Sequence, residues 1–265
     1  MELPIISQQP LIPEQPPTTV LQLLTSLSKV EVHEIMQPVE ILADWGTAKR
    51  YQIRNENGEQ CYDVLEESDG SERRFCGSQR GFVMHINNAL KAEVLTVKRE
   101  FRCCGGCCYG CCACVGCCQH DCVVESPTLG TLGTIRQRFG FLTTSFDVMD
   151  GKGARIFRIE IPFWKLMGFQ DKEFSIKNID DGTEIGKIIR KTARLAGEPI
   201  VFKKYTINFP TDLDVKLKAV LMGATFLIVN NFLEFQQIHD VDESTIGCGG
   251  LCFLMFKTSM QLILF

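Results

Sequence analysis

The most reactive side chains in this sequence are cysteines gathered in one short segment. The chain has 14 cysteines, and ten of them fall between Cys103 and Cys122. The CxxC spacing recurs there at Cys104–Cys107, Cys108–Cys111, Cys111–Cys114 and Cys114–Cys117. Two thiolates at this spacing can bind one zinc ion or an iron–sulfur cluster. A zinc site, however, normally holds two such pairs apart with a folded spacer, whereas these cysteines are crowded together. His120 adds one nitrogen ligand.

Covalent palmitate is the second interpretation of the cysteine segment. Adjacent cysteines beside basic residues are typical of membrane-proximal acylation, and Lys98, Arg99 and Arg102 supply the basic flank. Each buried acyl CH₂ contributes about 0.8 kcal/mol, so two or more chains anchor a protein stably. We favour acylation over a metal site, and a glycine-rich exposed loop without a special role is the third alternative. The expected attachment residues are Cys103, Cys104, Cys107, Cys108, Cys111, Cys112, Cys114, Cys117 and Cys118.

The rest of the sequence offers little support for an enzyme. The four histidines, His33, His85, His120 and His239, are scattered, and no hydrolytic triad stands out. The phosphate-loop, dinucleotide and zinc-protease motifs do not occur. His85 lies in an alternating pattern between Met84 and Ile86, which predicts a histidine on a sheet with its hydrogen bonds satisfied. We therefore expect neither hydrolytic nor redox catalysis.

Composition and charge indicate a globular protein outside the secretory route. Of 265 residues, 45% are hydrophobic and 23% are charged, and the formal net charge is -4. This balance excludes wholesale disorder. With no global basic field, we expect no nucleic-acid partner. The first positive charge is Lys29, and prolines interrupt the segment before it, which argues against a signal peptide. A reducing compartment follows, where a disulfide framework is disfavoured.

Residues 1–19 form a Pro-rich tail that we expect to be flexible. PLIP and PEQP have the PxxP spacing, which favours polyproline II and fits SH3 or WW domains. The same composition also suits a solvated leader without a partner, and we favour that interpretation.

From about residue 49 the sequence predicts a long series of β-hairpins. KRYQIRN and CYDVLEE flank Asn57-Gly58, two residues that tolerate positive φ. A further turn is expected near Asn87-Asn88, between GFVMHIN and AEVLTVKREF. Asp-Gly pairs next to apolar alternation recur at residues 69–70, 150–151 and 181–182. An open antiparallel sheet of this length would leave exposed edges. Closure into a barrel or a sandwich removes them.

After Pro210 the pattern changes to one apolar helix, which we expect over residues 212–235. Thr211 or Asp212 can cap it. A helix over 219–233 rises about 22 Å at roughly 1.5 Å per residue, whereas a bilayer core needs about 30 Å. The length therefore favours a helix buried inside a protein over a membrane span. If the helix did span, Lys216 and Lys218 would place its N-terminal side in the cytosol. Residues 236–265 form an uncertain C-terminal tail.

Three motifs in order resemble the phospholipid scramblase family. They are KRYQIRNENGEQCYDVLEE, EVLTVKREFRCC followed by the cysteine run, and INFPTDLDVKLKAVLMGATFLIVNNFLEF. The resemblance covers roughly residues 35–235. It implies a mainly β, tubby-like fold, in which residues 20–235 form a closed antiparallel β-barrel around a hydrophobic C-terminal helix. In the family the same helix is usually described as a single membrane span.

The resemblance also implies a function: ATP-independent, calcium-activated movement of phospholipids between leaflets. It further implies palmitoylated cysteines and a plasma-membrane location with the domain facing the cytosol. The family's calcium segment corresponds here to Val201–Asp212. An EF-hand loop needs oxygen ligands at positions 1, 3, 5 and 12, which are Val201, Lys203, Tyr205 and Asp212. Only Asp212 suits the ion, so Asp212 and Asp214 are weak calcium candidates that could equally cap the helix.

Two further functions stay open at the level of the sequence. The first is a palmitoyl-anchored adaptor whose barrel binds lipid headgroups or protein partners without transporting lipid. The second is a zinc- or iron–sulfur-binding protein that uses the CxxC pairs.

Overall fold

The computed structural model describes residues 21–35, 48–76, 80–102, 119–138, 143–162, 171–194 and 201–230. Three helices are α1 (Gln22–Thr25), α3 (Gly70–Cys76) and α5 (Val215–Ile228). The strands of the first half are β1 (Lys29–Ile35), β2 (Arg50–Asn55), β3 (Gln60–Glu67), β4 (Phe82–Asn87), β5 (Glu93–Arg99) and β6 (Asp121–Ser126). Those of the second half are β7 (Gly130–Arg138), β8 (Thr143–Asp150), β9 (Arg155–Pro162), β10 (Lys172–Asn178), β11 (Glu184–Arg194) and β12 (Val201–Asn208).

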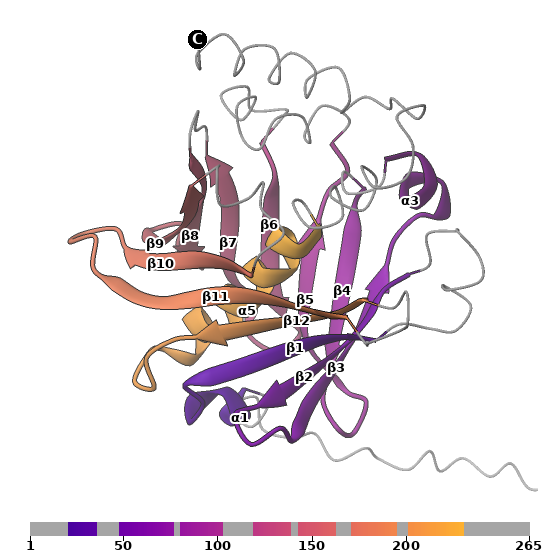
Figure 1. Cartoon of the computed structure of the whole chain (residues 1–265), viewed down its shortest axis with the longest axis horizontal. Coiled ribbons are helices and arrows are strands. Elements are labelled where there is room, and N and C mark those ends of the chain that lie inside the picture. Colours follow the sequence, from indigo (N-terminus) through magenta and orange to yellow (C-terminus); the bar gives the residue numbers. More distant parts are fainter. Residues whose placement is uncertain are drawn as a thin grey trace, which may run out of the picture.

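The strands form one closed antiparallel barrel (Figure 1). Each strand pairs with the next along the chain, and β1 closes the ring against β12. Val32, for example, lies opposite Ile53 of β2 on one side and Tyr205 of β12 on the other. The predicted closed β-barrel around a hydrophobic C-terminal helix is thus confirmed.

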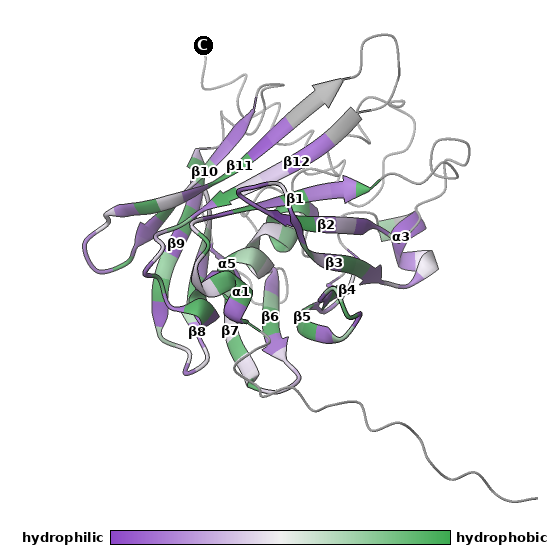
Figure 2. Ribbon diagram, turned by 90° about the horizontal axis from the view of Figure 1, so that it is seen from below, coloured by the Kyte–Doolittle hydropathy of each residue, from purple (hydrophilic) through white to green (hydrophobic). Residues whose placement is uncertain are grey.

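The alternation of apolar residues positions the core inside the ring. In β4 the pattern places Phe82, Met84 and Ile86 in the barrel, each no more than 2% exposed. Viewed from below, the strands surround α5, which has hydrophobic residues along it (Figure 2), whereas α1 lies at the lower end of the barrel in Figure 1. The barrel therefore has a single core, formed by the inner faces of the strands and the helix that they enclose.

Tight turns join the predicted hairpins. Gly58 has φ 83°, as the Asn-Gly turn between β2 and β3 requires. The turns at Asp150-Gly151 and Asp181-Gly182 also join adjacent strands, β8 to β9 and β10 to β11. These hairpins, and the one near Asn87-Asn88, are confirmed.

The Asp69-Gly70 pair does not form a hairpin turn, and that expectation was wrong. The carboxylate of Asp69 accepts the backbone N–H groups of Ser71 (2.8 Å) and Glu72 (3.0 Å), so it caps α3 instead. An aspartate before a short polar segment satisfies the free N–H groups of a helix start. The structure also contains β1, well before the predicted start of the sheet at residue 49. Without β1 the barrel could not close.

Helix α5 runs through the barrel and is buried continuously from Lys218 to its end. It begins at Val215, because Asp214 caps it, so the expected start at residue 212 and the expected cap at Thr211 or Asp212 were wrong. Residues 231–235 of the expected helix lie outside the described residues. Two glycines allow close packing: a Cβ on Gly223 would lie 2.5 Å from Val124, and one on Gly133 would lie 2.8 Å from Val220. Among the described residues, no helix has both the length and the hydropathy to cross a bilayer.

Candidate functional site

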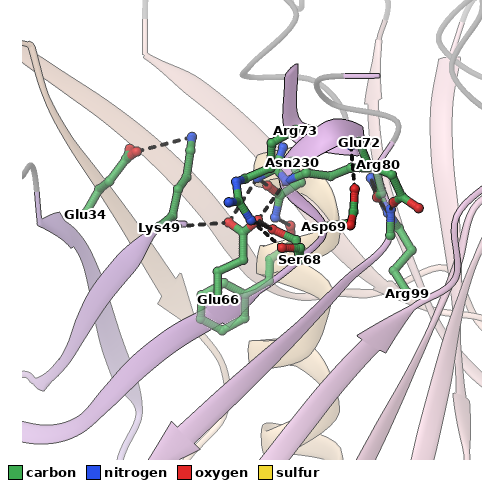
Figure 3. A network of polar contacts seen from close by, with 12 residues as sticks. Glu34, Lys49, Glu66, Ser68, Asp69, Glu72, Arg73, Arg80, Arg99 and Asn230 are labelled. Carbon is green, nitrogen blue, oxygen red and sulfur yellow. Dashed lines mark hydrogen bonds and ion pairs between the residues drawn. The ribbon is translucent and has the colours of Figure 1, made fainter. Parts of the chain in front are cut away.

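The C-terminal end of α5 is held by a buried ion pair (Figure 3). The Arg80 guanidinium donates to both carboxylate oxygens of Glu66, at 2.7 and 2.9 Å, and to Oδ1 of Asn230 at 3.0 Å. Asn230 in turn donates to the backbone oxygen of Phe226 at 2.9 Å. The two charged side chains are 3% and 0% exposed. A positive charge also suits the C-terminal end of a helix, so this network fixes the helix to strand β3.

The same network continues to the neighbouring strands. Arg99, at the end of β5, donates to the backbone oxygen of Arg80 (3.0 Å from Nε) and lies over the Phe82 ring at 4.7 Å. Glu72 of α3 accepts the N–H of Gly81 at 2.8 Å. The helix end, α3 and the last residues of β5 are therefore joined by polar contacts at one end of the barrel.

The described residues on either side of the cysteine segment lie at this end of the barrel. Arg102, the residue before it, contacts the carboxylate of Asp121 at 3.1 Å. After the segment, Gln119 donates to the backbone oxygen of Gln137 at 2.6 Å. The described residues on either side of the segment are thus tied to β6 and β7. The nine predicted attachment cysteines, Cys103 to Cys118, lie outside the described residues.

Cys122, the last cysteine of the cluster, belongs to the core instead. It lies in β6 and is fully buried, and burial raises the pKa of its thiol to about 12. A thiol without access to solvent and with so little thiolate is a poor acyl acceptor. This residue was not among the predicted attachment sites. His120 is also buried.

The N-terminal end of α5 contains a second buried cation. The Lys218 ammonium donates to the backbone oxygens of Leu24 (3.1 Å), Thr25 (2.8 Å), Leu27 (2.8 Å) and Thr211 (2.8 Å). Burial lowers the pKa of Lys218, and the nearby Asp212 opposes that shift. Because three of the four oxygens belong to the α1 region, Lys218 ties α1 to α5.

The sequence alone did not identify this role for Lys218. Its position beside Lys216 suggested a basic flank of an apolar helix. In the structure Lys216 is exposed, whereas Lys218 is completely buried. Three of the four acceptors, the carbonyl oxygens of Leu24, Thr25 and Leu27, are distant in sequence. Every residue has a main-chain carbonyl group, so the sequence does not show which ones will bind a lysine.

The calcium candidates lie close to Lys218, at the start of α5. Asp214 Oδ1 accepts the N–H groups of Lys216 (2.8 Å) and Leu217 (3.4 Å), and Asp212 is exposed. The expected EF-hand-like run begins with β12, Val201–Asn208, so Val201, Lys203 and Tyr205 are strand residues. Within the described part of the chain, no three His, Cys, Asp or Glu side chains are grouped to hold a metal. Calcium binding by Asp212 and Asp214 stays a prediction.

His85 has the role that its position in the alternating pattern predicted. It lies on the outside of β4, between Glu93 (2.5 Å) and Glu67 (2.8 Å). Burial lowers the pKa of His85, but its two carboxylate neighbours outweigh burial, and the net shift is upward. The residue is a sheet histidine with both ring nitrogens engaged.

The described part of the chain is an up-and-down antiparallel barrel that encloses helix α5, with a buried cation at each end of that helix. The model of the family described as Scramblase matches residues 7–236. The chain therefore belongs to the scramblase family.

Several curated relatives support the same assignment. Phospholipid scramblase 2 of Bos taurus is 31% identical over 215 residues, which cover 81% of this chain and 71% of the relative. Phospholipid scramblase 1 of Homo sapiens is 30% identical over 224 residues, 83% of this chain and 68% of the relative. Phospholipid scramblase 1 of Rattus norvegicus is 29% identical over 215 residues and is covered over 62% of its length.

Proposed function

We propose that this protein moves phospholipids between the two leaflets of a membrane without using ATP. The observation that carries the proposal is membership of the scramblase family over most of the chain, with relatives named phospholipid scramblases. A headgroup crosses hydrocarbon only at a high cost in desolvation. The protein must therefore lower that cost, by offering a polar path or by thinning the bilayer.

Membrane attachment in this proposal comes from palmitate on Cys103 to Cys118. The basic residues before the segment and the anchoring of both its ends to the barrel support the proposal. The residues that flank the segment, Arg102 and Gln119, lie at the end of the barrel where α5 also ends. Acylation there would place this end towards the cytosolic face of the plasma membrane. Attachment through several chains is effectively stable.

Calcium activation is a separate part of the proposal. Asp212 is exposed and Asp214 offers its second carboxylate oxygen, so the two can share one weakly held ion at the start of α5.

The Pro-rich residues 1–19, which lie outside the described residues, are a separate candidate for binding SH3 or WW partners.

The test is leaflet exchange of a fluorescent phospholipid in liposomes carrying the purified full-length protein, with calcium titrated from none to millimolar. Calcium-dependent exchange that is lost in Asp212→Asn/Asp214→Asn supports both parts of the proposal. An exposed control pair, Asp180→Asn/Asp181→Asn, should leave exchange unchanged. Exchange that does not depend on calcium would support lipid transport but would reject a calcium site at Asp212 and Asp214.

A lipid-tethered binding module is the second candidate function. It is favoured by the burial of α5 inside the barrel, since this helix then contributes to the core. Absence of exchange, with protein shown to be folded and membrane-bound, would reject transport and support this candidate. Release of the protein into a soluble pool by hydroxylamine, which cleaves thioesters, would support it further.

A further inference from the structure

Asp147 points outward from β8 and is nevertheless almost completely covered. Its side chain is 8% exposed, and three arginines contact it: Arg138 at 2.9 Å, Arg158 at 3.3 Å and Arg155 at 3.7 Å. Arg138 comes from β7, and the other two come from β9. One carboxylate thus holds guanidinium groups from both neighbouring strands.

The register extends this cluster across the outside of the barrel. Arg136 of β7 lies opposite Asp147 on one side and opposite Asp121 of β6 on the other. Asp147 lies opposite Arg158, which lies opposite Lys177 of β10. Paired residues in neighbouring strands point to the same face of a sheet. We name the group Arg136, Arg138, Arg155 and Arg158 the arginine face.

Positive charge is in excess over this surface. The paired residues Asp121, Arg136, Asp147, Arg158 and Lys177 form a row across strands β6 to β10. This row and the described side chains that contact it include six basic residues: Arg102, Arg136, Arg138, Arg155, Arg158 and Lys177. They also include three acidic residues, Asp121, Asp147 and Glu160. Among these nine side chains the basic residues exceed the acidic ones by three, although the whole chain has a net charge of -4. At the β11 edge of the row, Lys177 also lies opposite Glu184.

The guanidinium groups retain donors for a ligand. Each guanidinium has five N–H donors, whereas a carboxylate accepts at about four lone-pair positions. Three arginines on Asp147 consequently exceed what it can accept. The side chains are 39% exposed for Arg138, 57% for Arg155 and 38% for Arg158, so their remaining donors face solvent. Asp147 also holds these side chains in place, which lowers the entropy lost on binding.

The arginine face adjoins the residues that precede the cysteine segment. Arg136 and Arg102 share the carboxylate of Asp121, at 3.6 and 3.1 Å. The residue after Arg102 is Cys103, the first proposed acylation site. The cysteine segment therefore leaves the barrel from the edge of the arginine face. Guanidinium groups bind phosphate and carboxylate oxygens in pairs, and a row over several strands suits many headgroups better than one soluble ion.

We infer that the arginine face docks the barrel onto an anionic lipid surface, beside the acylated segment. This inference rests on the proposed membrane attachment but not on transport. The attraction to an anionic leaflet adds up over the basic residues near it and weakens with salt. Acyl chains would hold the protein at the membrane, and the arginine face would set which side of the barrel touches it.

The test uses full-length protein purified without acylation and sedimented with vesicles. Phosphatidylcholine vesicles with about 30% phosphatidylserine supply the anionic surface, and pure phosphatidylcholine vesicles are the comparison. We expect binding to the anionic vesicles that falls as salt rises. Arg136→Gln/Arg155→Gln should weaken it at least tenfold, at roughly fivefold for each basic residue. These two arginines are the most exposed and make the longest contacts of the face, 3.6 and 3.7 Å.

The matched control is Lys29→Gln/Lys187→Gln, which removes the same charge from β1 and β11. Both lysines, at 38 and 40%, are about as exposed as Arg138 and Arg158 and less exposed than Arg136 and Arg155, at 49 and 57%. Unchanged thermal unfolding would show that both variants fold. Equal weakening by the two pairs would overturn the inference, because only net charge would then matter. Failure of the wild type to prefer anionic vesicles, or complete displacement by millimolar inorganic phosphate, would also overturn it. Leaflet exchange is measured separately, so failure of docking and failure of transport can be told apart.

Discussion

Lys218 and Arg80 are buried cations at opposite ends of α5, and they illustrate what a single residue contributes here. Each is surrounded by acceptors from segments far away in sequence: Lys218 by carbonyls near α1, and Arg80 by Glu66 and Asn230. A buried charge is tolerated only when it is fully paired. Loss of either cation therefore leaves buried acceptors without donors.

We expect Lys218→Met to lower the free energy of unfolding by more than about 3 kcal/mol. An unsatisfied buried acceptor costs about 1–3 kcal/mol, and of the four carbonyl oxygens that would lose this donor, those of Leu24 and Leu27 are in buried hydrogen bonds. Urea denaturation measures the loss. The control, Lys216→Met, changes an exposed residue two positions earlier and should stay within about 0.5 kcal/mol. Equal effects of the two substitutions would contradict the role given to Lys218.

The stability contributed by His85 should depend on pH. The pKa of His85 is raised in the folded protein, so protonation favours folding. The contribution is complete below the unfolded pKa, about 6.5, and is lost as pH rises through the higher folded pKa. The free energy of unfolding of the wild type should therefore fall relative to His85→Gln between about pH 6 and about pH 8.

Urea denaturation of both proteins at the two pH values checks this prediction. The effect should be small, since the ring is 30% exposed and solvent screens its ion pairs. A difference between the two proteins that does not change with pH would show that the ion pairs of His85 do not stabilise the fold.

Among the elements, the hairpins with tight Asn-Gly or Asp-Gly turns were predictable from local sequence. The hairpin of strands β6 and β7 was not predictable in this way. Its turn has the sequence Pro127-Thr128-Leu129-Gly130 and contains neither an Asn-Gly nor an Asp-Gly pair. Strand β1 has the alternation Val30 and Val32, but its partner β12 lies at the other end of the domain. Local patterns therefore identify hairpins and fail for the pairing that closes the barrel.

The candidate site was less predictable than the fold. The cysteine segment was recognisable from composition and spacing. The ion pair of Arg80 and Glu66, the carbonyl oxygens around Lys218 and the coverage of Asp147 all depend on long-range register. Only the position of a residue on an inner or outer face follows from alternation, and its partners follow from the closed sheet.

At the level of elements, we expect Gly223→Ala to lower the melting temperature. The added methyl group would lie 2.5 Å from Val124 of β6, and overpacking of a core typically costs about 1–3 kcal/mol. The gain in helix propensity, roughly 1 kcal/mol, offsets only part of this cost. Thermal unfolding followed by circular dichroism measures the change. A higher melting temperature would mean that α5 has more space than the structure shows.

For the whole molecule, acylation should decide where the protein is found. We expect the variant with serine at all nine positions from Cys103 to Cys118 to move from the membrane fraction of expressing cells to the soluble fraction. Nine cysteines with several acyl chains would otherwise give stable attachment. Cys61→Ser/Cys76→Ser changes half-buried cysteines outside the segment and is the control. Retention of the nine-serine variant in the membrane would show that another part of the chain anchors it.

The closure of β1 against β12, with α5 following β12, also determines the order in which the chain can fold during synthesis. The hairpins can form as they leave the ribosome, since their contacts are local. The ring cannot close until its last strand has emerged, and the helix that fills it emerges later still. Contacts between distant segments form slowly because a long loop must first be closed. A newly made chain therefore passes through a stage in which an incomplete sheet and a separate apolar helix are both exposed, and in which a membrane or a chaperone can compete with the barrel for that helix.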